Sequence, residues 1–434
     1  MAYEREAILK PFREQEDYMR DRVRSGIEQN RKGRATVKVT DREGKPVPGA
    51  TITAVQKSHE FRVGANLFAL TEMETEEKAA EYRRLFAECF NLATLPFYWA
   101  FLEPERGRPR YAEDSPKIYR RPPIDTCLAF CEANGIEPKA HCLDYDIFAA
   151  DWVKEMNTVP EIRKALYKRF SELAERYAAR IPSWEVTNEN LFLPNPGRNT
   201  VNFTQSDNVE WDFRMADRLF PLNRLIINEA APNIWPCFNG NRSAYYMQIE
   251  RALYKGCRID SIGMQYHMVF PEEKEAEETK LYYSPEHLYR VMDCYAALGL
   301  PLQITELTVP CYRVSEADEE IQAEIIKNVY SMWFSHPAME AIIYWDVPDG
   351  YDWTELKGSL VRHDLTPKKA YRVIRDLFHR TWRTEEETVT DEAGRASFKG
   401  FFGDYEITVH AGEKSVKQDV KLLKKGKREF AVIV

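Results

Sequence analysis

One strand–helix–strand unit decides the fold: K-A-H-C-L (139–143), a helical segment over 160–179, and S-W-E-V-T (183–187). Two short runs of this kind, separated by a helix, are typical of a parallel sheet. Outward from this unit, the same alternation extends from about residue 61 to about residue 383. The other candidate strands are Phe61–Ala65, Leu92–Pro96, Arg224–Ile227, Ser261–Gln265, Gln303–Thr305 and Ala341–Tyr344.

Eight strands alternating with helices predict an α/β fold, a closed (β/α)₈ TIM barrel. The alternative is an open, doubly wound sheet. Such sheets carry a glycine-rich phosphate loop after a strand, and neither G-x-G-x-x-G nor G-x-x-x-x-G-K-[ST] follows any candidate strand. The closed barrel is therefore favoured.

Both ends of the chain have a different sequence pattern, in which apolar and polar residues alternate over short runs separated by turns. The stretches V-T-D-R-E-G-K-P-V-P-G-A-T-I-T (39–53) and T-D-E-A-G-R-A-S-F (390–398) show it. Two strands alone do not form a stable sheet, so the two ends are expected to share one antiparallel β-sandwich. Together they resemble a carboxypeptidase-regulatory-type sandwich, into which the barrel is inserted. Two independent β caps are the alternative.

The expected domains are an N-terminal amphipathic helix (1–33), a discontinuous sandwich (34–60 plus 385–434) and the barrel (61–384). Termini that lie close together make such an insertion tolerable.

Composition excludes several classes of protein. The 434 residues carry 61 basic and 69 acidic side chains, a net charge of −8, and the basic residues are scattered, so no nucleic-acid partner is expected. No apolar window is long enough to span a membrane, and the N-terminus lacks the apolar run of a signal peptide. A cytoplasmic location is expected, or a secreted one if a leader was removed. The eight cysteines form no C-x-x-C pair, so no disulfide, metal site or cofactor is expected. The oligomeric state stays open.

Polar side chains stand at the predicted strand ends, where barrel enzymes carry their functional groups. Six consecutive strands, from the third to the eighth, end in a carboxylate, an amide or an imidazole. The residues are His141, Asp144, Asn188, Glu189, Asn228, Glu229, Gln265, His267, Glu306, Trp345 and Asp346. Polar residues at so many strand ends, all on the same rim of the barrel, favour an active site. The alternative is that each of them only caps its own loop.

Glycosidic cleavage needs two carboxyl groups, which Glu189 and Glu306 supply at the ends of the fourth and seventh strands. A spacing of about 5–5.5 Å between them leads to retention of configuration. Asn188 is placed to bind the sugar 2-hydroxyl, and His267 to orient Glu306. We expect Glu189 to titrate well above Glu306, because one carboxylate disfavours ionisation of its neighbour.

Several stretches resemble glycoside hydrolase family 10, the xylanase family: W-E-V-T-N-E (184–189), G-M-Q-Y-H (263–267), I-T-E-L (304–307), N-G-I-E-P-K-A-H (134–141) and T-P-K-K-A-Y (366–371). The resemblance implies a retaining, endo-1,4-β-xylanase-like hydrolase with Glu189 as acid/base and Glu306 as nucleophile. It also implies that the attacked sugar lies against His141, Asn188, Gln265, His267 and Trp345, with Trp353 over the cleft. Among the loop aromatics, Tyr145 and Trp99 are further candidates for sugar contact, with core packing as the alternative.

Two stretches depart from the family pattern. T-L-P-F-Y-W (94–99) stands where the family has T-P-E-N-x-M-K-W, whose Glu, Asn and Lys grip the neighbouring xylose. H-C-L-D-Y-D (141–146) replaces H-T-L-V-W-H, and Asp346 replaces a glycine. A decorated or non-xylan β-glycoside is therefore an alternative substrate. A lyase, a metal-dependent hydrolase and a non-catalytic glycan-binding protein are the rival functions.

Overall fold

The structure is a computed structural model that describes residues 5–195, 197–313 and 315–434. The chain divides into two compact units. The first holds Met1–Glu16, Val63–Val329 and Ala338–Tyr371; the second holds Asp17–Arg62, Tyr330–Pro337 and Arg372–Val434. The expected domain limits at residues 33, 60 and 384 stay predictions.

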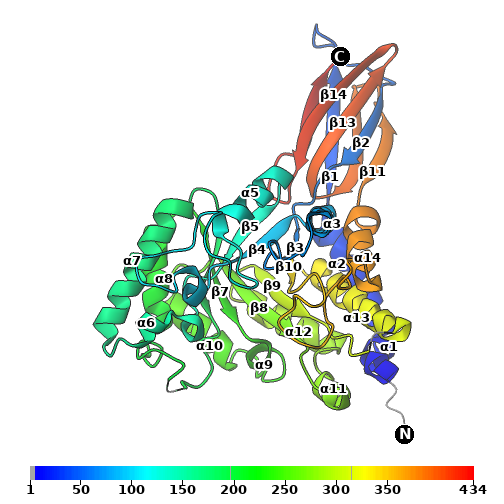
Figure 1. The fold of residues 1–434 in the computed structure, drawn as a ribbon. Helices are drawn as coiled ribbons and strands as arrows, with labels where there is room; N and C mark the ends of the chain where they lie inside the picture. Colours follow the sequence, from blue (N-terminus) through cyan, green and yellow to red (C-terminus); the bar gives the residue numbers. More distant parts are fainter. Residues whose placement is uncertain (1–4, 196, 314) are drawn as a thin grey trace. The chain divides into compact units, whose positions relative to one another are not determined.

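Eight parallel strands close into a barrel, in the order β10-β3-β4-β5-β6-β7-β8-β9 (Figure 1). Each predicted strand is present, so the closed barrel is confirmed and the open sheet is wrong. The bounds are β3 (Arg62–Asn66), β4 (Leu92–Pro96), β5 (Glu137–His141), β6 (Ser183–Asn188), β7 (Arg224–Glu229), β8 (Ser261–His267), β9 (Leu302–Thr308) and β10 (Met339–Tyr344). Every residue of β4, β6 and β9 is buried, which explains why these runs show little alternation.

Helices follow each of the barrel strands. The longer ones are α3 (Glu76–Cys89), α5 (Ile124–Asn134), α7 (Val159–Tyr177), α8 (Asn208–Leu219), α10 (Ala244–Tyr254), α12 (Pro285–Ala296), α13 (Glu316–Ser335) and α14 (Lys369–Asp376). In α3 the Thr75 side chain caps the first turn by accepting a hydrogen bond from the Lys78 N–H. Its buried residues, among them Tyr82, Leu85 and Phe86, recur three to four apart and so share one face.

Short helical segments shape the loops that follow the strands. They are α4 (Trp99–Leu102), η2 (Asp146–Phe148), α6 (Asp151–Lys154), α9 (Ala231–Ile234) and α11 (Glu272–Glu278). The N-terminal segment is broken into η1 (Arg5–Leu9), α1 (Lys10–Glu14) and α2 (Glu16–Asn30), and η3 (Leu377–Thr381) follows α14. Among the described residues, no helix combines the length and apolar composition needed to cross a membrane.

The sandwich takes strands from both ends of the chain, so the shared sandwich is confirmed and two separate caps are wrong. One sheet has the order β12-β1-β15. The other has the order β11-β2-β13-β14 (Figure 1). The bounds are β1 (Lys32–Thr40), β2 (Thr51–Gln56), β11 (Glu385–Val389), β12 (Arg395–Phe401), β13 (Gly403–Ala411), β14 (Lys414–Leu422) and β15 (Glu429–Ile433). Val37, Ile52, Ile407 and Val432 are among the residues of its common core.

One pairing differs from the antiparallel sandwich that was expected. β1 pairs with β12 antiparallel but with β15 parallel, from Thr36 opposite Glu429 to Thr40 opposite Ile433. The last strand can run this way because a loop after β14, not a tight hairpin, brings the chain back to β1.

Candidate active site

The ends of five neighbouring strands bring their polar side chains together. β5 ends at His141, β6 at Asn188, β7 carries Asn228, and β8 and β9 carry Gln265 and Glu306. All five residues are at least 96% buried. Buried polar groups need partners, and these residues find them in one another.

Glu306 accepts hydrogen bonds from two neutral donors. Asn228 Nδ2 lies 2.9 Å from Glu306 Oε1, and His267 Nε2 lies 3.1 Å from Glu306 Oε2. Burial lowers the pKa of His267 to about 4, so its imidazole is neutral near pH 7. Its Nδ1 lies 2.9 Å from the Thr308 hydroxyl and accepts from it, which leaves the proton on Nε2 for Glu306. The predicted orienting contact of His267 is present.

From the sequence we expected Glu306 to titrate well below Glu189, but the pKa of Glu306 is raised. Burial, helped by the carboxylates of Glu185 and Glu189, raises the pKa of Glu306 to about 8, while His141 and Lys139 oppose the rise. That expectation considered only the repulsion between the two catalytic carboxyls. It left out the removal of Glu306 from water, which disfavours the charged form.

Glu185 is the central anion of the barrel end. Lys139 Nζ and His141 Nδ1 both donate to its carboxylate, and Asn228 Nδ2 lies 3.3 Å from its Oε2. Against the effect of burial, the charges of Lys139 and His141 lower the pKa of Glu185 to about 2. Glu185 is therefore ionised, and it fixes the His141 ring with Nε2 left unpartnered among the described residues.

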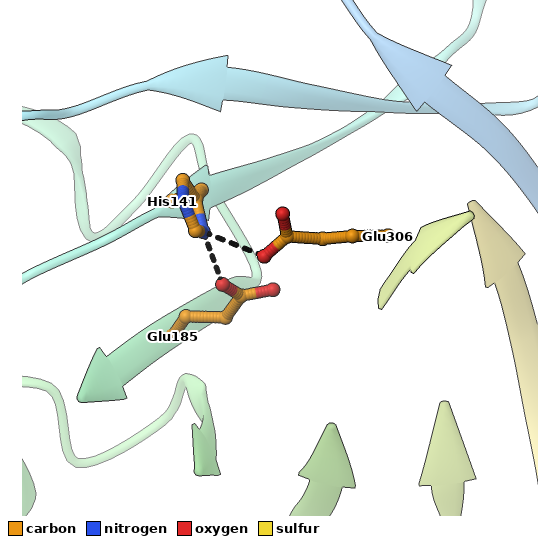
Figure 2. A group of neighbouring side chains, drawn as sticks. All are labelled: His141, Glu185 and Glu306. Atoms are coloured by element: carbon orange, nitrogen blue, oxygen red, sulfur yellow. Dashed lines mark hydrogen bonds and ion pairs between the residues drawn. The ribbon is translucent and has the colours of Figure 1, made fainter. Parts of the chain in front are cut away.

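Three of these side chains, His141, Glu185 and Glu306, point toward one another from β5, β6 and β9 (Figure 2). His141 Nδ1 is 3.9 Å from Glu306 Oε1, and one ligand atom of each residue lies within 4.8 Å of the others. Such a group could hold a metal ion. Its oxygens, however, already accept hydrogen bonds from Lys139 and Asn228, so we describe it as a hydrogen-bond network.

Glu189 follows β6 directly and has a positive φ of 57°. A non-glycine residue in this region is under backbone strain, which is characteristic of functional sites. Its carboxylate accepts from the Tyr145 hydroxyl and, at 2.9 Å, from Gln265 Nε2. Tyr145, a candidate for sugar contact, therefore binds the proposed acid/base itself.

Three amides join the surroundings of the two carboxylates. Asn188 Oδ1 accepts from Asn228 Nδ2 at 2.8 Å and from Gln265 Nε2 at 3.2 Å. Asn228 also donates to Glu306, and Gln265 also donates to Glu189. A continuous chain of hydrogen bonds thus runs from one glutamate to the other and holds both side chains in place.

Aromatic rings stand beside this network. The Trp345 ring lies 5.2 Å from the His141 ring and 5.9 Å from the His267 ring, and the Trp353 ring lies 4.8 Å from His267. Trp345 is 5% exposed, whereas Trp353 is 44% exposed and so is open to a ligand. The structure brings both predicted tryptophans to the candidate site.

Trp99 lies elsewhere. Its Nε1 donates to Glu103 Oε2 at 3.0 Å, and its ring packs on Trp152 at 5.4 Å and under the Arg169 guanidinium at 5.2 Å. Within the described part of the chain it has no contact with the group around Glu306. We therefore leave Trp99 out of the proposed sugar site.

Sequence reasoning did not select Lys139, Glu185 or Asn228 as site residues. A usable signal was present, because Lys139 and His141 lie two apart on one strand and so face the same side. Glu185, an acid inside a fully buried strand, needs a cationic partner there. Asn228 was recognised only as a polar strand end.

Comparison with known proteins places this site in a family. The family model of glycosyl hydrolase family 10 matches residues 57–377, about three-quarters of the chain. The chain belongs to this family. The match covers all eight barrel strands and every proposed site residue.

Curated relatives of this family 10 chain include anti-sigma-I factor RsgI6 of Acetivibrio thermocellus, 25% identical over 90% of this chain and 46% of the relative. Endo-1,4-beta-xylanase 2 of Arabidopsis thaliana is 24% identical over 95% of this chain and 34% of the relative. The chain thus spans less than half the length of either. Among solved structures, xylanase 10B of Thermotoga petrophila in complex with xylobiose has a TM-score of 0.59 and 23% identity, covering 74% of this chain and 95% of that one. This likeness supports the barrel fold.

Proposed function

We propose that the barrel is a retaining glycoside hydrolase that cleaves β-glycosidic bonds of xylan-like polysaccharide or oligosaccharides. The observation that carries the proposal is the hydrogen-bond chain that links Glu189 to Glu306 through amides. Two carboxyl groups held in this way at the ends of β6 and β9 are what a double displacement requires. Several relatives are named endo-1,4-beta-xylanases, which favours this substrate class.

In the first step, Glu306 attacks the anomeric carbon while the bond from that carbon to the leaving oxygen breaks. Glu189 gives its proton to the leaving oxygen, and a glycosyl ester forms on Glu306. Asn228 and His267 hold the carboxylate in the attacking orientation through their two hydrogen bonds.

In the second step, water attacks the anomeric carbon and Glu189 takes up its proton. The ester bond breaks, Glu306 recovers its negative charge, and the sugar leaves with its original configuration. Tyr145 and Gln265 steady Glu189 in both steps, because each donates to a different oxygen of its carboxylate.

We assign the attacked sugar to the surface formed by His141, Asn188, Gln265, His267, Trp345 and Trp353. His141 Nε2 is buried without a partner among the described residues. Leaving such a group unpaired costs about 1–3 kcal/mol, and a sugar hydroxyl would satisfy it. The Trp345 and Trp353 rings offer flat apolar faces for the C–H groups of a sugar.

Azide rescue tests the two roles separately. Glu306→Ala should lose nearly all activity on a nitrophenyl β-xyloside, and added azide should restore turnover with an α-glycosyl azide as product. Glu189→Ala with azide should instead give the β-glycosyl azide, because the ester on Glu306 still forms. Glu155→Gln, an exposed change outside the network, is the matched control. Full activity in both Glu306→Gln and Glu189→Gln would refute the assignment, and binding of xylan without any turnover would favour a glycan-binding protein.

A further inference from the structure

Arg121 is a cation that lacks an acidic partner. Among the described residues, the only hydrogen bond of its guanidinium runs from Nη1 to the Arg120 carbonyl at 2.8 Å, and its buried Nε has no acceptor. No carboxylate forms an ion pair with it in that part of the chain. A charge removed from water without a counter-charge is costly, and burial correspondingly lowers the pKa of Arg121.

Aromatic rings surround the Arg121 guanidinium. It lies 4.4 Å from the ring centre of Tyr98, 4.7 Å from that of Phe101 and 5.2 Å from that of Phe68. Cation–π contacts of this kind offset part of the desolvation cost. They hold the charge in place without neutralising it.

Nearby acids are already committed to other cations. Asp346 accepts from Arg120 Nη2 at 2.5 Å and from Asn66 Nδ2 at 3.1 Å. Glu72 lies 3.2 Å from Lys117 Nζ and accepts from the Arg120 backbone N–H. The positive charge of Arg121 is therefore not compensated at this edge of the site.

The rings that hold Arg121 also touch the proposed reaction centre. The Tyr98 ring lies 5.1 Å from the His141 ring, and His141 Nδ1 is 3.9 Å from Glu306 Oε1. Arg121 is thus one aromatic ring away from His141, and its side chain stays partly exposed. A ligand next to the attacked sugar is within its reach.

We propose that Arg121 binds the carboxylate of an acidic sugar, so that the enzyme prefers β-glycosides that carry a uronic acid beside the sugar under attack. This inference rests on the proposed glycosidase function. A guanidinium matches a carboxylate in charge and in geometry, since two parallel N–H groups face two oxygens.

Paired substrates test the inference. One is a xylo-oligosaccharide with a single glucuronic acid branch, and the other is the same compound with its carboxyl reduced to a primary alcohol. The wild type should have the higher kcat/KM on the acid. Arg121→Gln should lower the acid-to-alcohol ratio of kcat/KM by about 10- to 100-fold, the value of a hydrogen bond to a charged group. Arg121→Lys should keep part of the ratio.

Arg106→Gln is the matched control, because Arg106 lies on the same loop with its guanidinium 5.4 Å from the Trp152 ring centre but is exposed. It should keep the wild-type ratio. Thermal unfolding checks that each variant is folded, and calorimetric binding of both sugars to the wild type gives the preference without any turnover. Equal kcat/KM and equal affinity for the acid and the alcohol would overturn the inference, as would an unchanged ratio in folded Arg121→Gln. Failure of the glycosidase proposal would appear differently, as no turnover of either sugar.

Discussion

Asn228 on β7 donates a hydrogen bond from Nδ2 to Oε1 of Glu306 on β9, 2.9 Å away and across the intervening strand β8. The same Nδ2 reaches Asn188, while Asn228 Oδ1 accepts from the Thr305 hydroxyl at 2.6 Å. The amide is thereby fixed with its donor side toward the carboxylates. Asn228 therefore connects the hydrogen bonds that hold Glu306 with those that hold Glu189.

Asn228→Ala should lower kcat about 10- to 100-fold, because Glu306 loses one of its two donors. Loss of a donor disfavours the charged form, so the acidic limb of the pH profile should also move to higher pH. Steady-state kinetics over a pH series measures both effects. Asn134→Ala is the control, since among the described residues the Asn134 side chain donates only within its own helix, to the Phe130 carbonyl. An unchanged kcat in Asn228→Ala would remove this amide from the mechanism.

The pH dependence of kcat/KM should show the raised pKa of Glu306. Attack needs the ionised carboxylate, so kcat/KM should rise with pH through an apparent pKa above the ordinary glutamate value and toward about 8. Measurement of kcat/KM against pH on a neutral nitrophenyl glycoside gives this limb directly. An acidic limb at or below the ordinary glutamate value of about 4.3 would contradict the effect of burial on Glu306.

Tyr145→Phe removes the hydroxyl that binds Glu189 and leaves the ring. We expect kcat to fall about 10-fold on an alkyl or sugar leaving group, which needs the proton of Glu189. A nitrophenolate leaves without that proton, so the loss on nitrophenyl substrates should be smaller. Tyr119→Phe, which removes an exposed hydroxyl bound to the Gly350 carbonyl, is the control. An equal loss on both leaving groups would argue for a general structural effect.

Stability should depend on pH through Asp144 and Asp212. Both carboxyls are buried and face each other, so one must carry a proton; burial raises the pKa of Asp144 to about 7 and that of Asp212 well above its usual range. Between about pH 4 and 7 the unfolded chain releases this proton while the folded chain keeps it. The free energy of unfolding should therefore fall by roughly 2–4 kcal/mol as pH rises through this window.

Asp212→Asn should flatten that dependence, since an amide can donate to an ionised Asp144. Urea unfolding at pH 4.5 and pH 7.5 measures it. Asp217→Asn, at a half-exposed position, should behave as the wild type does. A wild-type stability that rises between these two pH values would refute the shared proton.

The barrel was predictable because its strands are short apolar runs between helices, and each predicted run lies within a few residues of the observed strand. Glu306 and Glu189 were predictable for a related reason. Glu306 stands near the end of a short apolar run, and Glu189 directly follows another. The sandwich was predictable from alternation at both ends of the chain. The parallel pairing of β15 with β1 was not, because strand direction depends on how the chain returns after β14.

The contacts between strand ends could not be predicted in the same way. Tyr145 reaches Glu189 from the loop after β5, and no spacing in the sequence encodes that distance. Tyr98 and Trp99 are neighbours in the chain, yet α4 begins between them. The helix sends Trp99 toward Trp152, whereas Tyr98 packs on His141.

Trapping of the glycosyl-enzyme tests the central claim most directly. A 2-deoxy-2-fluoro-β-xyloside with a dinitrophenolate leaving group should form the ester but hydrolyse it slowly, so that the intermediate accumulates. Mass spectrometry of the digested protein should find one fluorosugar per chain, on the peptide that holds Glu306. A label on Glu189, or release of the leaving group with no label at any time, would contradict the assignment of Glu306 as the nucleophile.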